Sequence, residues 1–290
     1  MTVEAAAASE ARFHSFAVFV AVCAFILLGA GGLVTSTGSG LSVPDWPLSF
    51  GGFFPRMTGG VFFEHGHRMI AGAVALLTIG LGLRAWIGRE RRPLRVTAAF
   101  CVGAIALQAL LGGLTVILRL PPAVSILHAG LAQIVFCLLV ALSEMSSGAY
   151  SSFSPKLAAP VALRSALAVV MVYSQIILGA VARHTGLWVG VHAFWAAAVV
   201  LAAAMAASAA LGTGAVSLRA PGIAVATLLP LQIFLGVASY WWLYSDAPSL
   251  GWTGGVALRT AHVLVGALLL GACLVLALRS CCLPEKAGAA

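Results

Sequence analysis

The stretch VGAIALQALLGGLTVILRLPPAVSILHAGLAQIVFCLLVAL, residues 102–142, contains two long apolar runs separated by a short segment with one arginine and two prolines. An α-helix needs about 20 consecutive apolar residues to cross the hydrocarbon core of a bilayer. We therefore interpret the stretch as a hairpin of two transmembrane helices. Gln108 lies in the first helix, and His128 lies near the start of the second.

The same pattern extends over the whole chain. Its residues are 61% hydrophobic and only 8% charged, whereas a soluble domain carries about 25% charged residues. We predict an all-α integral membrane protein with eight transmembrane helices. The predicted helices span residues 15–36, 62–86, 96–118, 124–145, 161–182, 187–211, 221–243 and 255–278.

The distribution of basic residues predicts the orientation in the membrane. An even number of helices places both termini on one side, and the loops and ends of that side hold eleven of the 16 Lys and Arg residues, including the run RERRPLR at 89–95. Cytoplasmic segments are rich in Lys and Arg. We predict a bacterial-type cytoplasmic membrane protein with both termini in the cytoplasm. Because the net charge of +8 follows this pattern and forms no basic patch with interleaved aromatics, we exclude nucleic-acid binding.

A short motif repeats in the odd-numbered helices. It reads QALLGG at 108–113, QIILGA at 175–180, QIFLGV at 232–237 and FILLGA at 25–30, where Phe25 takes the place of glutamine. One helical hairpin is thus used four times, which is also a four-helix unit used twice. We predict two similar four-helix bundles. They comprise residues 1–145 and 161–290, joined by a cytoplasmic linker at 146–160.

Four of the seven histidines lie at equivalent places, within the first turns of the even-numbered helices. They are His67, His128, His192 and His262. A single histidine near a helix end is usually an interfacial polar residue, but ionisable residues inside membrane helices tend to mark functional sites. Four matching positions indicate a shared ligand role near the outer face. We do not expect the remaining histidines, His14, His65 and His184, to be ligands. We expect His14 to be solvated.

Heme iron suits this arrangement, because it takes two axial ligands and histidine serves well. Two even helices in each bundle supply two histidines, so the sequence predicts two bis-histidine hemes, or one heme and one equivalent pocket. Zinc is disfavoured because no cysteine or carboxylate cluster completes a four-ligand shell. No Met-rich motif supports copper. The six cysteines show neither zinc spacing nor a disulfide framework.

Charged residues accompany the histidines at the starts of the even helices. Glu64 precedes His67 by three residues and shares its helix face. It can handle protons or water beside a bound group, or it can form an i,i+4 ion pair with Arg68, and the sequence leaves both open. Arg68, Arg183 and Arg259 are candidates for pairing with heme propionates, with interfacial snorkelling as the alternative.

The longest outer loop, residues 37–61, is rich in Gly, Pro and aromatic residues. Loops of this length in compact proteins are usually functional or disordered. A flexible linker would be more polar than this segment. We predict an ordered cap at the membrane surface.

The motifs VTSTGSGLSVPDWP (34–47) and EHGHR (64–68), together with His128, His192 and His262, resemble the heme A synthase family. The resemblance covers essentially the whole chain. It implies an eight-helix membrane enzyme made of two similar four-helix halves. Such an enzyme oxidises the C8 methyl group of heme O to a formyl group, giving heme A for terminal oxidases.

The resemblance also implies roles for single residues. The C-terminal half would hold a heme b cofactor between His192 and His262. The N-terminal half would bind the substrate heme O at His67 and His128, and Glu64 would be needed for the reaction. The implied partners are the heme O synthase that supplies the substrate and a membrane electron donor or acceptor, with a homo-oligomer as a further possibility.

One feature departs from the family pattern. Many bacterial members carry a cysteine pair in an outer loop, whereas loop 37–61 has Ser49 and no cysteine. The resemblance therefore predicts that packing and hydrogen bonds hold this loop.

Two other functions use the same features. A diheme electron carrier needs the same four histidines but not Glu64, and its hemes usually lie near opposite membrane faces, which disfavours it here. A transporter built from repeats would need polar residues at the membrane midplane. The helices contain Pro230 but no midplane charge, which disfavours a transporter.

Overall fold

The computed structural model describes residues 3–147, 160–244 and 251–281, and within these ranges it contains eight α-helices and no β-strand. Each helix is long and apolar enough to cross a bilayer, so the chain is an integral, multi-pass membrane protein. The helices are α1 (Val3–Thr37), α2 (Gly60–Ile87), α3 (Arg92–Ile117), α4 (Pro122–Met145), α5 (Pro160–Thr185), α6 (Val189–Gly212), α7 (Val216–Tyr244) and α8 (Gly251–Ser280).

All eight predicted helices are confirmed, with ends that differ by a few residues in most cases. The largest difference is in α1, which begins at Val3 instead of residue 15. Its first turns are rich in alanine and glutamate, which are strong helix formers. These residues extend the helix beyond the predicted apolar run.

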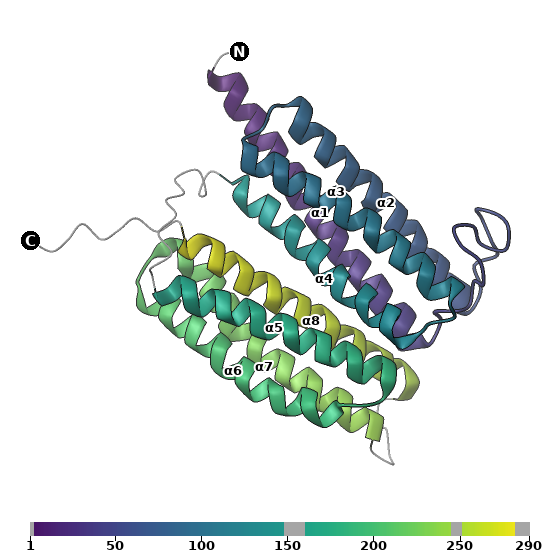
Figure 1. Ribbon diagram of the computed structural model, residues 1–290. Helices are drawn as coiled ribbons and strands as arrows, with labels where there is room; N and C mark the ends of the chain where they lie inside the picture. The colour runs from purple at the N-terminus through teal and green to yellow at the C-terminus, as the bar shows by residue number, and fades with distance from the viewer. Residues whose placement is uncertain (1–2, 148–159, 245–250, 282–290) are drawn as a thin grey trace, which may run out of the picture.

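The helices pack as two groups of four (Figure 1). In the N-terminal half, α1 and α3 each contact both α2 and α4; in the C-terminal half, α5 and α7 each contact both α6 and α8. The two halves meet where α1 and α4 face α5 and α8. This arrangement fits two four-helix bundles. The boundary at 146–160 stays a prediction, because residues 148–159 lie outside the described ranges.

Each half has its own apolar core. Buried residues of α1–α4 form one cluster that includes Phe13, Leu81 and Leu139. The cluster of α5–α8 contains many alanines, among them Ala203 and Ala206, which let the helices approach closely. These cores fix the helices on whose ends the candidate site lies.

Successive helices alternate in direction, so all even-numbered helices begin at the same end of the molecule. The long connection between α1 and α2, residues 38–59, also lies at this end, opposite the start of α1 (Figure 1). We call this the loop end and the opposite end the far end. The four candidate histidines therefore share the loop end.

Two polar contacts tie helices together at the far end. Arg279 of α8 donates from Nε to Oε1 of Glu144 in α4 at 2.7 Å and from Nη2 to Oε2 at 3.0 Å. His14 of α1 places Nδ1 3.0 Å from the carbonyl oxygen of Ser143 and 3.1 Å from Oγ of Ser146. The prediction that His14 is solvated is therefore wrong. Its ring is half-buried and joins α1 to α4.

Candidate functional site

Each of the four predicted histidines lies against a glycine of the preceding odd-numbered helix. A Cβ atom added to that glycine would meet Cε1 of the imidazole at 3.0–3.2 Å, which is closer than ordinary van der Waals contact. The glycines therefore leave the space that the rings occupy. The pairs are Gly31 with His67, Gly112 with His128, Gly179 with His192, and Gly236 with His262.

Three of the histidines also contact a glutamine one turn from the glycine. The side-chain amide of Gln108 donates to the carbonyl oxygen of His128 at 3.0 Å, and that of Gln175 donates to the carbonyl oxygen of His192 at 2.9 Å. In these two pairs, and between Gln232 and His262, the amide nitrogen lies 3.4 Å from Nε2 of the ring.

The first repeat differs from the register that its sequence suggested. Aligning FILLGA with the other motifs places Gly29 at the position of the glycines that face histidines in the other three repeats. In the structure, however, Gly29 faces Leu264, and Gly31 faces His67. Since the glutamines precede their glycines by four residues, the equivalent position in α1 is Leu27 and not Phe25. The cause is an extra glycine pair in α1, which allows close approach at more than one position.

In each repeat, the same histidine atom lacks a hydrogen-bond partner, and so does the same glutamine atom where a glutamine is present. Nδ1 of all four imidazoles, and Oε1 of Gln108, Gln175 and Gln232, are buried and form no hydrogen bond within the described residues. Buried polar groups nearly always have a partner, and each one left without a partner costs about 1–3 kcal/mol. The repetition of this pattern points to a site built for a bound group. The histidines are His67, His128, His192 and His262.

The imidazoles of His192 and His262 face one another with ring centroids 6.4 Å apart and planes at 79°. Two imidazoles that share one metal ion through bonds of about 2.0 Å each would hold their centroids about 6 Å apart. Within the described ranges no three His, Cys, Asp or Glu side chains converge. The pair therefore fits a group that needs two histidines, as heme iron does.

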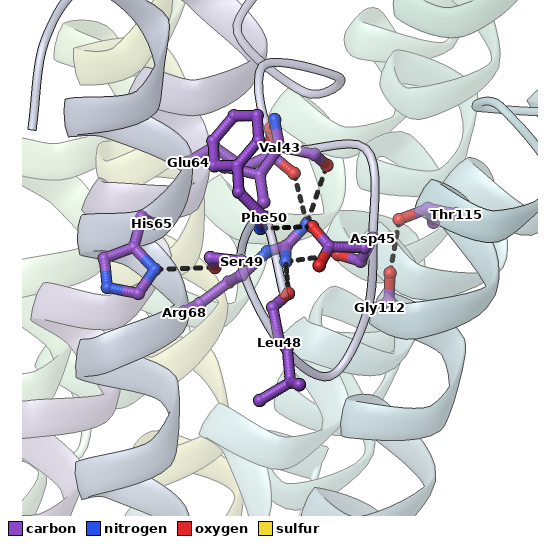
Figure 2. A network of polar contacts seen from close by, with 10 residues as sticks. All are labelled: Val43, Asp45, Leu48, Ser49, Phe50, Glu64, His65, Arg68, Gly112 and Thr115. Carbon is purple, nitrogen blue, oxygen red and sulfur yellow. Dashed lines mark hydrogen bonds and ion pairs between the residues drawn. The ribbon is translucent and has the colours of Figure 1, made fainter. Parts of the chain in front are cut away.

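Glu64 lies in α2, three residues before His67, and is only 3% exposed. Its Oε1 accepts a hydrogen bond from Nη2 of Arg68 at 2.6 Å, and its Oε2 accepts one from the backbone N–H of Val43 at 2.8 Å (Figure 2). The i,i+4 ion pair considered from the sequence is thus formed. Oε2 holds the loop directly and Oε1 binds Arg68, which also contacts the loop, so Glu64 has a positioning role whatever its part in chemistry.

Arg68 fastens the loop to α2. Nη1 donates to the carbonyl oxygens of Asp45 at 2.7 Å and Leu48 at 3.1 Å, and Nη2 donates to that of Val43 at 3.1 Å (Figure 2). With Glu64, four protein acceptors surround its two terminal nitrogens. The proposed contact of Arg68 with a propionate stays a prediction, and these bonds favour the loop as its partner.

Two further contacts order the loop itself. Oγ of Ser49 lies 2.8 Å from Nδ1 of His65, which is buried (Figure 2). Asp45 accepts hydrogen bonds from the backbone N–H groups of Phe50 at 2.7 Å and Gly51 at 2.8 Å. The N–H groups of Gly51 and Phe50 lower the pKa of Asp45 below its ordinary value. Hydrogen bonds hold this loop, and His65 serves that purpose.

The loop also packs onto the helices of the N-terminal half. The indole of Trp46 lies on Gly113 of α3, where an added Cβ would meet ring atoms at 2.6–2.9 Å. At the loop tip Phe53 and Phe54 are 72% and 87% exposed. Aromatic residues of this kind are common at membrane interfaces. The prediction of an ordered cap fits this arrangement.

Arg183 and Arg259 bind the end of α1 from the opposite half. Nη2 of Arg183 donates to the carbonyl oxygen of Thr35 at 2.6 Å, and Nη2 of Arg259 donates to that of Ser36 at 2.8 Å. The last carbonyl groups of a helix lack partners within the helix and attract cations. Arg259 also lies over the ring of Trp242 at 4.9 Å. Their predicted pairing with propionates stays a prediction.

The sequence did not assign a role to several residues of this site. The glutamines were visible only as part of a repeat, and the glycines beneath the imidazoles were not distinguished from other small residues. The spacing of four residues between each glutamine and its glycine was the available signal, because residues four apart share one helix face. His65, Ser49 and Asp45 gave no comparable signal.

The geometry agrees with the comparisons to known proteins. A family model described as cytochrome oxidase assembly protein matches residues 54–191. Curated heme A synthases are similar to this chain: that of Bacillus pumilus is 32% identical over 169 residues, covering 55% of each chain, and that of Exiguobacterium sibiricum is 30% identical over 184 residues, covering 60% of each. The heme A synthase of Bacillus licheniformis is 32% identical over 167 residues. The chain thus spans somewhat more than half the length of the curated relatives it matches.

The matched segment contains the loop anchor Arg68 and two of the four site histidines, His67 and His128, and it ends one residue before His192. The resemblance inferred from the sequence motifs is therefore confirmed. This chain is similar to heme A synthases over somewhat more than half of its length.

Proposed function

We propose that this protein is a heme A synthase that oxidises the C8 methyl group of heme O to a formyl group. The observation that carries the proposal is the fourfold histidine arrangement, with His192 and His262 facing at a ring-centroid distance of 6.4 Å. The similarity to heme A synthases supports it. Heme O is then the substrate, and heme A is the product for terminal oxidases.

In the C-terminal half, His192 and His262 are the residues that would hold heme b. Gly179 and Gly236 leave room for the two rings, and a larger residue at either position would displace its imidazole. Bound heme with two histidine ligands supplies one-electron transfer. The surrounding protein supplies position and an environment with few polar groups.

In the N-terminal half, His67 and His128 are the proposed ligands of heme O. The loop of residues 38–59 covers this half, and Trp46 packs onto α3 close to Gly112. Glu64 is the proposed catalytic residue, which would hold or transfer a proton near the methyl group. Its contacts with Arg68 and Val43 give it a fixed position for that purpose.

The arginines of the C-terminal half are the better candidates for propionate contacts. Among the described residues, Arg183 forms a hydrogen bond through Nη2 alone. Arg259 forms hydrogen bonds through Nε and Nη2, and its Nη1 has no partner there. Arg68 uses both terminal nitrogens on the loop and Glu64. Arg183 and Arg259 therefore retain donors for a carboxylate.

The proposal includes a membrane orientation and partners. Both termini would lie in the cytoplasm and the histidines near the outer face, as the distribution of Lys and Arg indicates. A heme O synthase would supply the substrate. A membrane electron donor or acceptor would exchange electrons with the protein, and a homo-oligomer is a further proposed partner arrangement.

Paired substitutions test the division between the halves. Membranes are prepared from cells that supply heme O and express the wild-type chain, His192→Ala or His67→Ala. The bound hemes are extracted, and their masses are determined. We expect His192→Ala to lose heme b, and His67→Ala to keep heme b but form no heme A. Heme A formation by both variants at the wild-type level would contradict the proposal. Normal heme b without any conversion in the wild type would instead favour the electron carrier.

A further inference from the structure

We propose that the outer surface of α3 and α4 carries a binding site for an anionic phospholipid, with its phosphate group at Arg95 and one acyl chain in the groove that extends from there. An apolar groove of about 490 Å³ runs between these helices. Its walls include Val96 and Phe100 of α3 and Ile134 and Leu138 of α4. The site does not depend on the proposed heme chemistry.

The groove has the length of one bilayer leaflet. It extends along α3 from Val96, near the far end, to Leu107, which corresponds to about 16 Å of helix. Half of a hydrocarbon core of about 30 Å is about 15 Å. The acyl chain of a lipid in the leaflet at the far end would therefore lie along the groove. A whole transmembrane helix of a second protein would need about twice this length.

Arg95 lies where the groove reaches the far end, and its donors lack acceptors. The guanidinium lies over the ring of Trp86, which also lines the groove, with 5.3 Å between Cζ and the ring centroid. Its Nε is buried without a hydrogen bond, and its terminal nitrogens form no hydrogen bond or ion pair with any described residue. A phosphate group offers acceptor oxygens in the geometry that a guanidinium binds best.

The segment around Arg95 is strongly basic. The run RERRPLR at 89–95 has four arginines and one carboxylate, Glu90, which accepts a hydrogen bond from Arg84 at 3.3 Å. Arg92 lies three residues before Arg95 and therefore on the same side of the helix. The first turn of α3 contains no acidic residue. An anionic headgroup would supply the negative charge that this part of the protein lacks.

The charge and the groove together favour an anionic lipid over other occupants. The positive-inside rule requires Lys and Arg residues near helix ends, but it requires no groove beside them. An uncharged apolar chain would fill the groove and leave the donors of Arg95 without acceptors. A soluble phosphate would bind Arg95 and leave the groove unused. An anionic phospholipid uses both features.

Lipid binding to the purified full-length chain tests this proposal. The protein in detergent is titrated with phosphatidylglycerol or with phosphatidylcholine that has the same acyl chains, and native mass spectrometry resolves the bound lipids. We expect phosphatidylglycerol to bind at least about tenfold more tightly, because the choline cation would lie among the arginines. Equal affinities for the two lipids would overturn the proposal.

Arg95→Gln tests the headgroup contact. Because it removes the charged donors, it should weaken phosphatidylglycerol binding about tenfold or more. Arg219→Gln is the matched control, since it removes the same charge from an exposed position at the same end of the other half. Equal losses in the two variants would show a general effect of charge and refute the site. If Arg95→Gln does not fold, Arg95→Lys keeps the charge without the forked donors, and unchanged affinity there would refute the role of the guanidinium.

Gly103→Leu tests the acyl-chain contact. Gly103 lines the groove, and a Cβ added to it would meet no atom within 4 Å. The new side chain would therefore occupy the groove, and phosphatidylglycerol binding should weaken about fivefold or more. Gly72→Leu is the control, since Gly72 is also exposed, with open space at its Cβ, and lies on α2 away from the groove lining. Unchanged affinity in Gly103→Leu would show that the headgroup binds alone, which contradicts the proposal.

The same variants distinguish two other occupants of the groove. If farnesol, an uncharged isoprenoid alcohol, binds as tightly as phosphatidylglycerol and Arg95→Gln leaves its affinity unchanged, the groove holds an uncharged chain. If the wild type is a dimer in detergent and Gly103→Leu dissociates it, a second copy of the chain covers the groove. Either result would overturn the assignment of an anionic phospholipid.

Discussion

Glu64 holds the loop and is also the proposed catalytic residue, two roles that the sequence could not separate. Its carboxylate is almost fully buried, and it accepts hydrogen bonds from Arg68 and from the start of the loop. Removing one partner of a buried ion pair typically costs about 3–5 kcal/mol, because the remaining charge is left without compensation. A change at Glu64 therefore affects the loop as well as any proton transfer. The two effects can be distinguished by comparing Glu64 with Arg68.

Replacing Glu64 by glutamine should stop or stall the oxidation and leave heme b bound. The amide keeps the shape of the carboxylate but cannot take up a proton, and the C-terminal histidines do not contact it. Extracted heme from membranes with a heme O supply gives the measurement. Wild-type amounts of heme A from Glu64→Gln would show that the assigned catalytic role is wrong.

Arg68→Gln provides the comparison for that result. It removes four hydrogen bonds to the loop and to Glu64, so we expect trypsin to cleave faster at the exposed Arg56 in the loop. If Glu64→Gln loses activity while Arg56 stays as protected as in the wild type, proton chemistry accounts for the loss. Faster cleavage in both variants would point to the loop.

Asp45 gives the loop a predictable response to pH. The N–H groups of Gly51 and Phe50 lower its pKa, so the folded loop favours the ionised form. Its stabilisation is present at every pH above the ordinary carboxyl value and is lost only as the pH falls through the lowered pKa. We expect the Phe50 and Gly51 amides to keep the same hydrogen-exchange protection from about pH 8 to about pH 5. Asp45→Asn should lose protection at every pH, and protection that declines across this range in the wild type would contradict the assignment.

At the scale of the helix, the repeat acts through close contact between a glycine and an imidazole. Each odd helix presents a glycine to the histidine of the next helix at a distance that leaves no room for a side chain. Hydropathy predicted these helices, and the sequence itself placed a histidine near the start of each even helix, since both features are local. Hydropathy could not reveal which glycine lies beneath the ring. In α1 the contact falls on Gly31 and not on Gly29, because packing of two helices decides it.

Gly236→Ala should reduce heme b binding in the C-terminal half. The new methyl group would lie about 3.0 Å from Cε1 of His262, so the ring has to leave its present position relative to His192. We expect affinity for heme b to fall by about tenfold or more, measured by titration of the purified protein. Gly190→Ala in α6 is the control, since its Cβ would meet open space. Unchanged affinity in Gly236→Ala would contradict the packing argument.

At the scale of the molecule, three arginines join the two halves. Arg183 and Arg259 reach the end of α1 at the loop end, and Arg279 binds Glu144 at the far end. The sequence placed all three near helix ends, where snorkelling is common. It could not indicate that their partners lie in the other half, 135 to 223 residues away. Such contacts follow from how the halves pack, as does the loop held by Glu64.

Glu144→Gln should lower the stability of the whole protein without altering either histidine pair. The pair with Arg279 is bidentate and partly buried, so its loss should cost about 1–3 kcal/mol, between the values for exposed and buried pairs. Thermal unfolding in detergent, followed by circular dichroism, measures the change. Arg219→Gln, at the exposed Arg219 on the same end, is the control. An unchanged Tm in Glu144→Gln would show that this contact does not hold the halves together.

The identity of the heme in membranes that contain this chain tests the account most directly. Heme is extracted from cells with a heme O source, with and without the chain, and its mass is determined. We predict heme A, or its alcohol precursor, only when the chain is present. Heme b and unchanged heme O in both samples would contradict the assignment of a heme A synthase, and the absence of any heme bound to the purified chain would contradict the proposed role of the four histidines.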